Sequence, residues 1–296
     1  MNGSMISATG LLCSITASLL FGLTPWYVQW LSPLDGMSLF WSRIIFSTAV
    51  ALLFLLSTRK WPAFRRLLAD WRQCAWLAAG TLIVATQWWL FVWAPINGLT
   101  TELSLGYFLL PLTLVLSGRF VYKEEIRGWQ KIAIVLASIG VAHELWAFGS
   151  LSWVPILVAG TYPLYFMIRK RVKACNLTCF FFENLLLFPL AVLFLSLDNS
   201  YMSIVTSASE FKWLLPGLGI LCTSAMLIYV SASRLLPVSL FGLLSYIEPA
   251  LIFFVAVAIL GEPVSSEQWL TYGFIGLASL LICFDSIRLV RQAQPA

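Results

Sequence analysis

Charged residues are scarce in this chain, and their scarcity is the first guide to its class. Only 10% of the 296 residues are Asp, Glu, Lys or Arg, whereas 60% are apolar, and the mean hydropathy is +0.89. A soluble globular domain carries about 25% charged residues because it must cover its core with polar surface. The composition therefore excludes a soluble protein and predicts an all-α polytopic membrane protein.

Motifs of catalysis and nucleotide binding are missing as well. The chain has one histidine, so a His-based metal site cannot be assembled, and we expect neither a metal nor a cofactor. His143-Glu144 begins like a zinc-protease motif but has no second histidine to complete it, and neither a P-loop nor a G-x-S-x-G sequence occurs. These absences argue against an enzyme and against an ATP-driven pump.

Apolar segments long enough to cross about 30 Å of hydrocarbon recur along the whole chain. Ten membrane-spanning helices are predicted, at 8–31, 35–57, 74–95, 102–121, 129–147, 152–169, 177–197, 212–233, 238–260 and 267–288. The two longest connections, near 58–73 and 198–211, are too small to form domains.

Lysine and arginine gather in every second connection. The even-numbered loops and the C-terminus hold sixteen of the 18 basic residues, whereas the odd-numbered loops hold only Lys212. Basic loops stay on the cytoplasmic side of a membrane. The pattern predicts that both termini are cytoplasmic, and it assigns the net charge of +5 to loops at a membrane rather than to a nucleic-acid-binding surface.

Several features occur twice, at an offset of 138 residues. G-x-x-P-x-Y motifs begin at Gly22 and at Gly160, and the same offset joins Pro111 to Pro249. Each half contains five predicted helices, an odd number, so the second half must enter the membrane from the opposite side. We predict two inverted five-helix repeats, with a substrate site near the middle of the membrane where they meet. Chance similarity between two apolar sequences is the alternative.

The repeats are predicted to span residues 1–147 and 148–296, and their sequences resemble a known family. The chain is similar to the EamA-type carriers of the drug/metabolite transporter superfamily, and within them to RarD-like proteins. The segments that carry the resemblance are Ser42 to Ile45, Trp88 to Trp93 with Asn97, Glu102 to Pro111, Tyr122 to Glu124, Leu145 to Ser150, Leu260 to Glu262, and Asp285. The resemblance implies a carrier of the bacterial-type inner (plasma) membrane that exports small metabolites such as amino acids.

Two charged residues are predicted deep inside apolar spans, where each costs roughly 2.5–3.5 kcal/mol on insertion scales. Arg43 lies about 12 Å into its span and Glu248 about 15 Å into its own, at 1.5 Å per residue. An arginine holds a carboxylate with its planar guanidinium, and a glutamate accepts an ammonium group or a proton. We expect the pair to bind an amino-acid-like zwitterion. The alternatives are that the two residues neutralise each other, or that Arg43 satisfies carbonyl groups of a broken helix.

Further site residues are predicted from polar groups and from prolines inside the spans. Side chains expected to contact the substrate are Trp88, Tyr107, Tyr165, Tyr246 and Gln87. Glu183 joins Glu248 as a candidate for proton coupling, unless it makes only a polar contact between helices. Each proline removes a helix hydrogen bond, so hinges are expected, with static kinks as the alternative, at Pro25, Pro111, Pro163 and Pro249.

The sequence thus predicts a secondary transporter that exports small amino-acid-like or zwitterionic metabolites by alternating access. Drugs and opine-type metallophores are further substrate classes, and proton antiport is one way to drive export. The expected partners are the small-molecule substrate, the lipid bilayer and, for antiport, a proton. A monomer is expected, and a dimer stays open. The rival functions are an intramembrane enzyme and a membrane sensor or assembly subunit.

Overall fold

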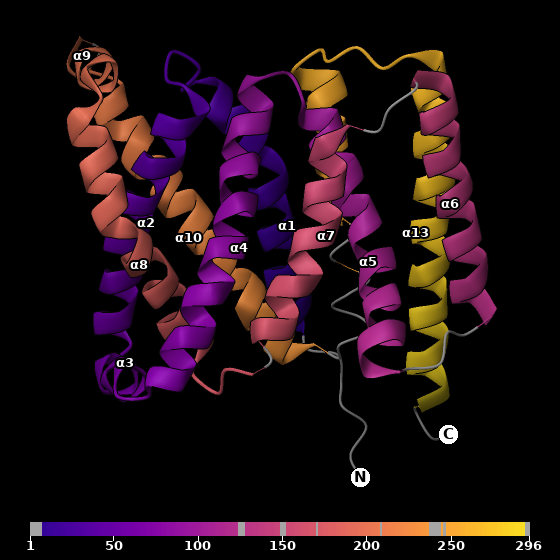
Figure 1. Cartoon of the computed structure of the whole chain (residues 1–296), viewed down its shortest axis with the longest axis horizontal. Coiled ribbons are helices and arrows are strands. Elements are labelled where there is room, and N and C mark those ends of the chain that lie inside the picture. The colour runs from indigo at the N-terminus through magenta and orange to yellow at the C-terminus, as the bar shows by residue number, and fades with distance from the viewer. Residues whose placement is uncertain are drawn as a thin grey trace. The chain divides into compact units, whose positions relative to one another are not determined.

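The computed structural model describes residues 8–123, 128–148, 152–169, 171–207, 209–236, 244 and 247–293 (Figure 1). All the elements in these ranges are helical. They are α1 (Ala8–Gln29), α2 (Gly36–Ser57), α3 (Trp61–Leu68), α4 (Trp71–Ile96), α5 (Thr100–Tyr122), α6 (Gly128–Phe148), α7 (Trp153–Arg169), α8 (Asn176–Leu197), α9 (Asn199–Ser207), α10 (Phe211–Leu235), α12 (Ile247–Phe254), the π-helical turn η1 (Val255–Ile259) and α13 (Ser266–Ala293).

Many of the helices have the length and composition of membrane spans. Within the described residues, five are long and apolar enough to cross a membrane: Thr9–Gln29, Gly36–Ser57, Trp71–Ile96, Asn176–Leu197 and Phe211–Ala232. The predicted all-α polytopic membrane protein is therefore confirmed, while the predicted total of ten spans stays a prediction.

Each of the two longest predicted connections contains a short helix, α3 or α9. Neither helix is long enough to cross a membrane, which needs about 20 residues. Pro62 occupies the first turn of α3, where its missing N–H costs no hydrogen bond. Phe64 and Leu67 on the inner face of α3 are each 2% exposed. Packing of one apolar face therefore stabilises a helix in what looked like a loop.

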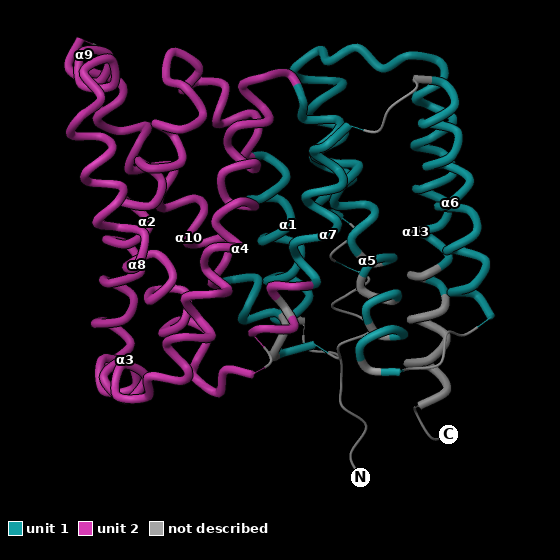
Figure 2. The backbone as a smooth tube through the Cα atoms, viewed as in Figure 1, with its two compact units in different colours: residues 1–23, 99–163, 228–296 teal, residues 24–98, 164–227 magenta. Residues whose placement is uncertain are grey.

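The chain packs as two compact units, which Figure 2 colours separately. Unit 1 comprises Met1–Leu23, Leu99–Pro163 and Ile228–Ala296, and unit 2 comprises Thr24–Gly98 and Leu164–Leu227. Each unit takes helices from both predicted repeats. The division by packing is thus a different property from the predicted repeats, which stay a prediction.

Unit 1 is built around two pairs of helices that lie side by side. α6 packs along α13, and α5 packs against α12. A glutamate after η1 fastens this unit: the carboxylate of Glu262 accepts the backbone N–H groups of Thr100, at 2.8 Å, and of Thr101, at 2.7 Å. These two N–H groups begin α5 and have no partner within their own helix. Glu262, which the sequence singles out only as part of a repeated ending, thus caps a helix 161 residues earlier.

Unit 2 is built around α2, which packs against α8 and α4. Asp35 caps α2, because its carboxylate accepts the N–H of Ser38 at 2.6 Å. The far end of α8 is tied back to the same turn, where the Ser38 hydroxyl donates to Asp198 at 2.8 Å. This frame holds the candidate site described next.

Candidate functional site

Arg43 is the charged residue of α2, and its side chain is buried in unit 2. The residue is 5% exposed, and the guanidinium carbon lies 4.9 Å from the ring centroid of Trp88 on α4. This cation–π contact attracts the guanidinium to the ring face but supplies no hydrogen-bond acceptor in its plane. Arg43 Nε and Nη1 find no acceptor among the described residues. Buried donors of this kind favour a bound anion, because a charge without a partner is costly away from water.

Trp88 joins Arg43 to a third helix. The Trp88 ring is 6% exposed, and its centroid lies 5.7 Å from that of Phe180 on α8, in an edge-to-face arrangement. Gln87, the neighbour of Trp88 on α4, is 1% exposed. Two predicted site residues, Arg43 and Trp88, are therefore in contact. Trp88 orients the arginine, a role that the sequence did not indicate.

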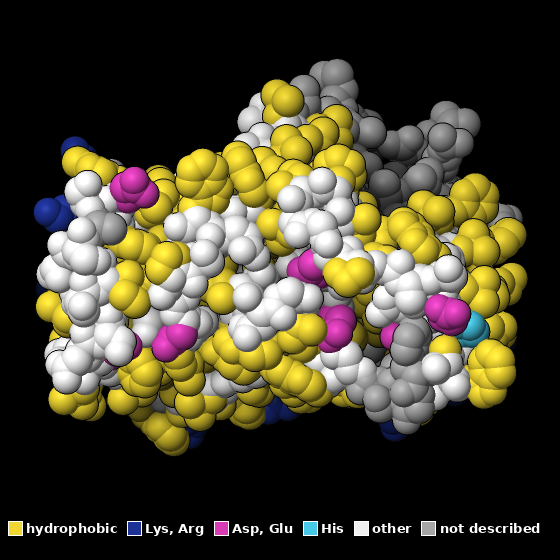
Figure 3. Space-filling view, turned by 90° about the horizontal axis from the view of Figure 1, so that it is seen from above, with side chains coloured by type: hydrophobic (Ala, Val, Ile, Leu, Met, Phe, Trp, Pro, Cys, Tyr) yellow, Lys and Arg dark blue, Asp and Glu magenta, His cyan; other side chains and the backbone are white. Residues whose placement is uncertain are grey.

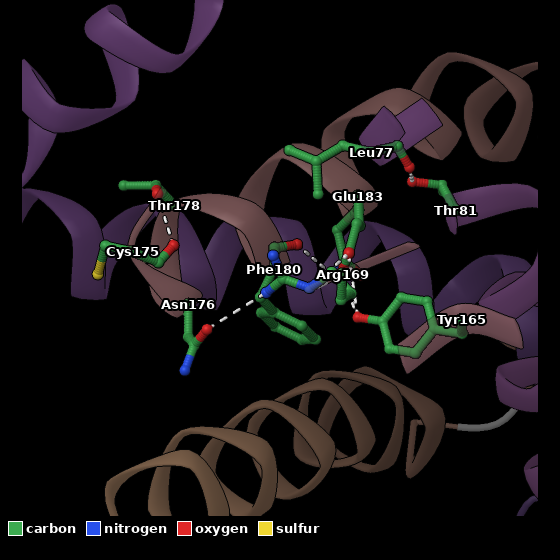
Figure 4. Close-up of polar contacts among 10 residues, drawn as sticks. Leu77, Thr81, Tyr165, Arg169, Cys175, Asn176, Thr178, Phe180 and Glu183 are labelled. Atoms are coloured by element: carbon green, nitrogen blue, oxygen red, sulfur yellow. Dashed lines mark hydrogen bonds and ion pairs between the residues drawn. The ribbon is translucent and has the colours of Figure 1, made fainter. Parts of the chain in front are cut away.

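Glu183 lies on α8, one turn beyond Phe180, and is completely buried. The hydroxyl of Tyr165 on α7 donates to its carboxylate, at 3.0 Å from Oε1 and 3.3 Å from Oε2. Nε of Arg169, in the last turn of α7, lies 3.5 Å from Oε1 (Figure 4). The predicted residues Tyr165 and Glu183 thus meet in one network between α7 and α8.

Arg169 is a site residue that the sequence analysis placed in a basic connection. The structure instead includes it in α7, with a side chain that is only 15% exposed and directed to Glu183. It also donates from Nη2 to Asn176 Oδ1 at 3.5 Å, as Figure 4 shows. An arginine at the end of a span next to a run of basic residues looks like a loop residue. Its position 14 residues before a buried glutamate was the only sequence signal for a pair.

Asn184 adds a buried acceptor beside this network. Its Nδ2 donates to the Phe180 carbonyl at 2.8 Å, while Oδ1 has no donor among the described residues. Arg43, Trp88, Phe180 and Asn184 thus form a series of neighbours across α2, α4 and α8. The series offers donors at one end, an acceptor at the other and aromatic rings between them.

Other predicted residues lie in unit 1 or outside the described residues. Tyr107 faces Tyr162, with ring centroids 5.9 Å apart, and Glu248 lies in the first turn of α12. Because Glu248 and Arg43 belong to different units, their predicted pairing stays a prediction. Tyr246 falls outside the described residues.

The predicted hinge prolines are distributed over four helices. Pro25 lies inside α1 and Pro163 inside α7. In α12 the carbonyl of Pro249 accepts the hydroxyl of Ser104 from α5, at 2.8 Å. The side chain of Pro111 is outside what the structure describes.

The described residues contain no group of three or more His, Cys, Asp or Glu side chains that could hold a metal ion. What the site offers chemically is a buried cation with free donors, aromatic rings and a buried acid. Such a set suits reversible binding of a small polar molecule.

Comparisons with known proteins give a consistent picture. No family model matches the chain. It is 43% identical over 291 residues to the chloramphenicol-sensitive protein RarD of Pseudomonas aeruginosa, covering 97% of both chains. It is 34% identical to an uncharacterized transporter of Haemophilus influenzae, covering 94% of each, and 28% identical to the protein RarD of Escherichia coli, covering 96% of each.

A solved structure described only as the crystal structure of a protein also matches. Its TM-score is 0.56 at 17% identity, and the match covers 95% of this chain and 99% of the other. At this identity the likeness concerns the fold alone.

Proposed function

Because the chain belongs to the RarD-like membrane transporters, we propose that it is a secondary transporter exporting small amino-acid-like or zwitterionic metabolites. The observation that carries the substrate class is Arg43, buried over Trp88 with Nε and Nη1 free among the described residues. A carboxylate accepts two parallel hydrogen bonds from such a fork. The adjacent rings of Trp88 and Phe180 suit the apolar part of a metabolite or a drug.

We infer further that the chain consists of ten spans in two inverted repeats. The helix positions support this: α3 begins at Trp61 and α9 at Asn199, and α6 begins at Gly128 and α13 at Ser266. Both pairs have the offset of 138 residues found in the sequence. Helices related in this way also pack together within each unit, as α2 does with α8 and α6 with α13. Figure 1 places α3 and α9 at opposite ends of unit 2, as an inversion requires.

The proposed orientation puts both termini in the cytoplasm of a bacterial-type inner membrane. The support comes from two basic connections that lie at the same end of unit 2. Lys173 N donates to Gln73 Oε1 at 3.1 Å, and the guanidinium of Arg171 lies 4.4 Å from the ring centroid of Trp76. These contacts hold the α7–α8 connection against the start of α4, as expected if both connections are cytoplasmic.

Alternating access is proposed to rock unit 1 against unit 2, with hinges at Pro25 and Pro163. The chain passes from one unit to the other next to these prolines, between residues 23 and 24 in α1 and between residues 163 and 164 in α7. Two residues beyond each proline a tyrosine fixes the helix to unit 2. Tyr27 donates to the Leu214 carbonyl at 2.8 Å, and Tyr165 donates to Glu183. A proline lacks the hydrogen bond that would stiffen the helix at the crossing.

For proton coupling the proposal favours Glu248 over Glu183. The carboxylate of Glu183 is already satisfied by Tyr165 and Arg169. Glu248 has no hydrogen bond or ion pair with any other residue in the described ranges. Relatives that carry a functional description are named transporters, and no observation favours the enzyme or the sensor.

The substrate class is tested by binding to the purified chain. An amino acid is compared with the amine that lacks only its carboxyl group, for wild type, Arg43→Gln and the control Arg171→Gln, which also removes an arginine from a tryptophan face. Loss of a charge-assisted hydrogen bond costs about 1.5–3 kcal/mol, or roughly 10- to 100-fold in affinity. Wild type and Arg171→Gln should prefer the amino acid by that factor, and Arg43→Gln should not. An unchanged preference in Arg43→Gln would overturn the assignment.

A further inference from the structure

The short helix α3 lies across the ends of the long helices of unit 2. Figure 1 shows α3 end-on, whereas α2 and α8 run along the plane of the picture. α3 packs against α4 and α8, and the ring of Phe64 lies 4.9 Å from that of Phe181 on α8. Its apolar face is therefore fixed to the ends of membrane-spanning helices, and its opposite face is directed outward. A helix held in this way lies in the plane of the membrane interface.

Basic side chains surround α3 and lack acidic partners. We call the following seven residues the α3 surface: Arg59, Lys60, Arg65, Arg66, Arg72, Arg171 and Lys173. None of them forms an ion pair within the part of the chain that the structure describes, where the one ion pair joins Arg169 to Glu183. The nearest acid, Asp70, is used as a helix cap, because it accepts the N–H groups of Arg72 and Gln73 at 3.1 and 3.2 Å. The positive charge of this surface is therefore available to an outside anion.

Large apolar side chains stand exposed among these cations. Trp61 is 41% exposed, Leu68 49% and Trp71 72%. Tryptophan prefers the level of the lipid headgroups, where its ring is half in hydrocarbon and half in water. A soluble anionic partner would need no such side chains, whereas a lipid presents an anionic headgroup and an acyl chain together.

The other end of unit 2 supplies an internal comparison. α9 occupies the corresponding position 138 residues later, and Asn199–Ser207 contains no charged residue. Its flanks carry Asp198, Glu210 and Lys212. Figure 3, which looks onto the α9 end, shows Asp and Glu side chains among apolar ones, with Lys and Arg only at the margins of the view. The helix position is shared, but the cations are confined to α3.

We propose that the α3 surface binds the headgroups of anionic phospholipids in the leaflet that it faces. Arginine forks donate to the phosphate oxygens, and Trp61, Leu68 and Trp71 reach the acyl region beside them. Topology signalling by basic loops needs only net charge, whereas this surface combines seven cations with three exposed apolar anchors on a docked helix. The inference is independent of the transported substrate.

The test is retention of lipid by the purified full chain, counted by native mass spectrometry. The protein is relipidated in micelles with equal amounts of phosphatidylglycerol and phosphatidylcholine. Each cation near an anionic membrane surface contributes roughly fivefold in affinity. Wild type should prefer phosphatidylglycerol, and Arg65→Gln/Arg66→Gln/Arg72→Gln should lose that preference by at least tenfold. Raising the salt to about 0.5 M should weaken the wild-type preference, because exposed charges are screened.

Two controls keep the outcome interpretable. The variant Arg65→Lys/Arg66→Lys/Arg72→Lys keeps the charge and should retain most of the preference, which separates loss of charge from loss of fold. Lys212→Gln removes a cation at the α9 end and should bind lipid like wild type. Two results would overturn the proposal. One is a triple glutamine variant that, while still folded, prefers phosphatidylglycerol as wild type does. The other is an equal loss of preference in Lys212→Gln.

Discussion

The Arg169–Glu183 pair predicts an unequal response to two truncations. Removal of Arg169 leaves a completely buried carboxylate with only the Tyr165 hydroxyl as a partner. Removal of Glu183 leaves an arginine whose side chain is 15% exposed and which keeps Asn176 as an acceptor. Breaking a buried pair costs about 3–5 kcal/mol because the remaining charge has no partner. Arg169→Ala should fall in that range, and Glu183→Ala should cost less, since water still reaches the guanidinium.

The measurement is the thermal midpoint of the purified protein, followed with a thiol-reactive dye. Cys179 and Cys222 are 0% and 1% exposed, so they react only when unit 2 opens. At about 2–4 °C per kcal/mol for a chain of this size class, Arg169→Ala should lower the midpoint by roughly 6–15 °C. The double variant should cost less than the sum of the single ones, because the two side chains are coupled. Equal single effects that add in the double variant would refute this account of the pair.

Three further predictions concern the hinge, the packing and the pH dependence of stability. Pro163→Ala should lower the transport rate and leave substrate affinity unchanged, which flux measured across substrate concentrations will separate; an unchanged rate would remove the hinge. Gly219→Ala should lower the thermal midpoint, at a cost of about 1–3 kcal/mol, since its Cβ would lie 2.8 Å from the Phe46 carbonyl carbon, whereas Gly160→Ala should be neutral because nothing lies within 4 Å; equal effects would contradict this contact. The Tyr201 N–H and the Ser38 hydroxyl lower the pKa of Asp198 below its usual value, so its stabilisation is complete above pH 4 and is lost as the pH falls through the lowered pKa; midpoints measured from pH 7 to pH 3 should therefore fall less steeply for Asp198→Asn, and parallel curves would contradict the pairing.

The membrane class and several site residues could be predicted because lipid imposes strong rules on sequence. A buried charge is expensive in hydrocarbon, so Arg43 and Glu183 stand out within apolar segments of the sequence, and both are buried in unit 2. Pairing between distant segments was beyond the sequence. Glu262 recognises two N–H groups of α5 more than 160 residues away, and such backbone donors leave no signature in residue type.

Other features were missed because local patterns were ambiguous. α3 is eight residues long, so an amphipathic surface helix looked like a basic loop. Arg169 was counted with that kind of loop although its side chain turns inward. The two units could not be predicted, because each combines helices from both halves of the chain. Their borders near Pro25 and Pro163 depend on how helices pack, which repeats in sequence do not reveal.

The central claim is that the chain moves a carboxylate-bearing metabolite across a membrane, with Arg43 as the group that holds the carboxylate. Flux of a panel of amino acids and related metabolites in proteoliposomes, with and without an imposed proton gradient, tests it most directly. The account predicts flux in wild type, loss of carboxylate-dependent flux in Arg43→Gln, and flux without gradient dependence in Glu248→Gln. Flux of carboxylated substrates at the wild-type level in Arg43→Gln would contradict the site, and no flux of any panel member in wild type would contradict the proposed substrate class.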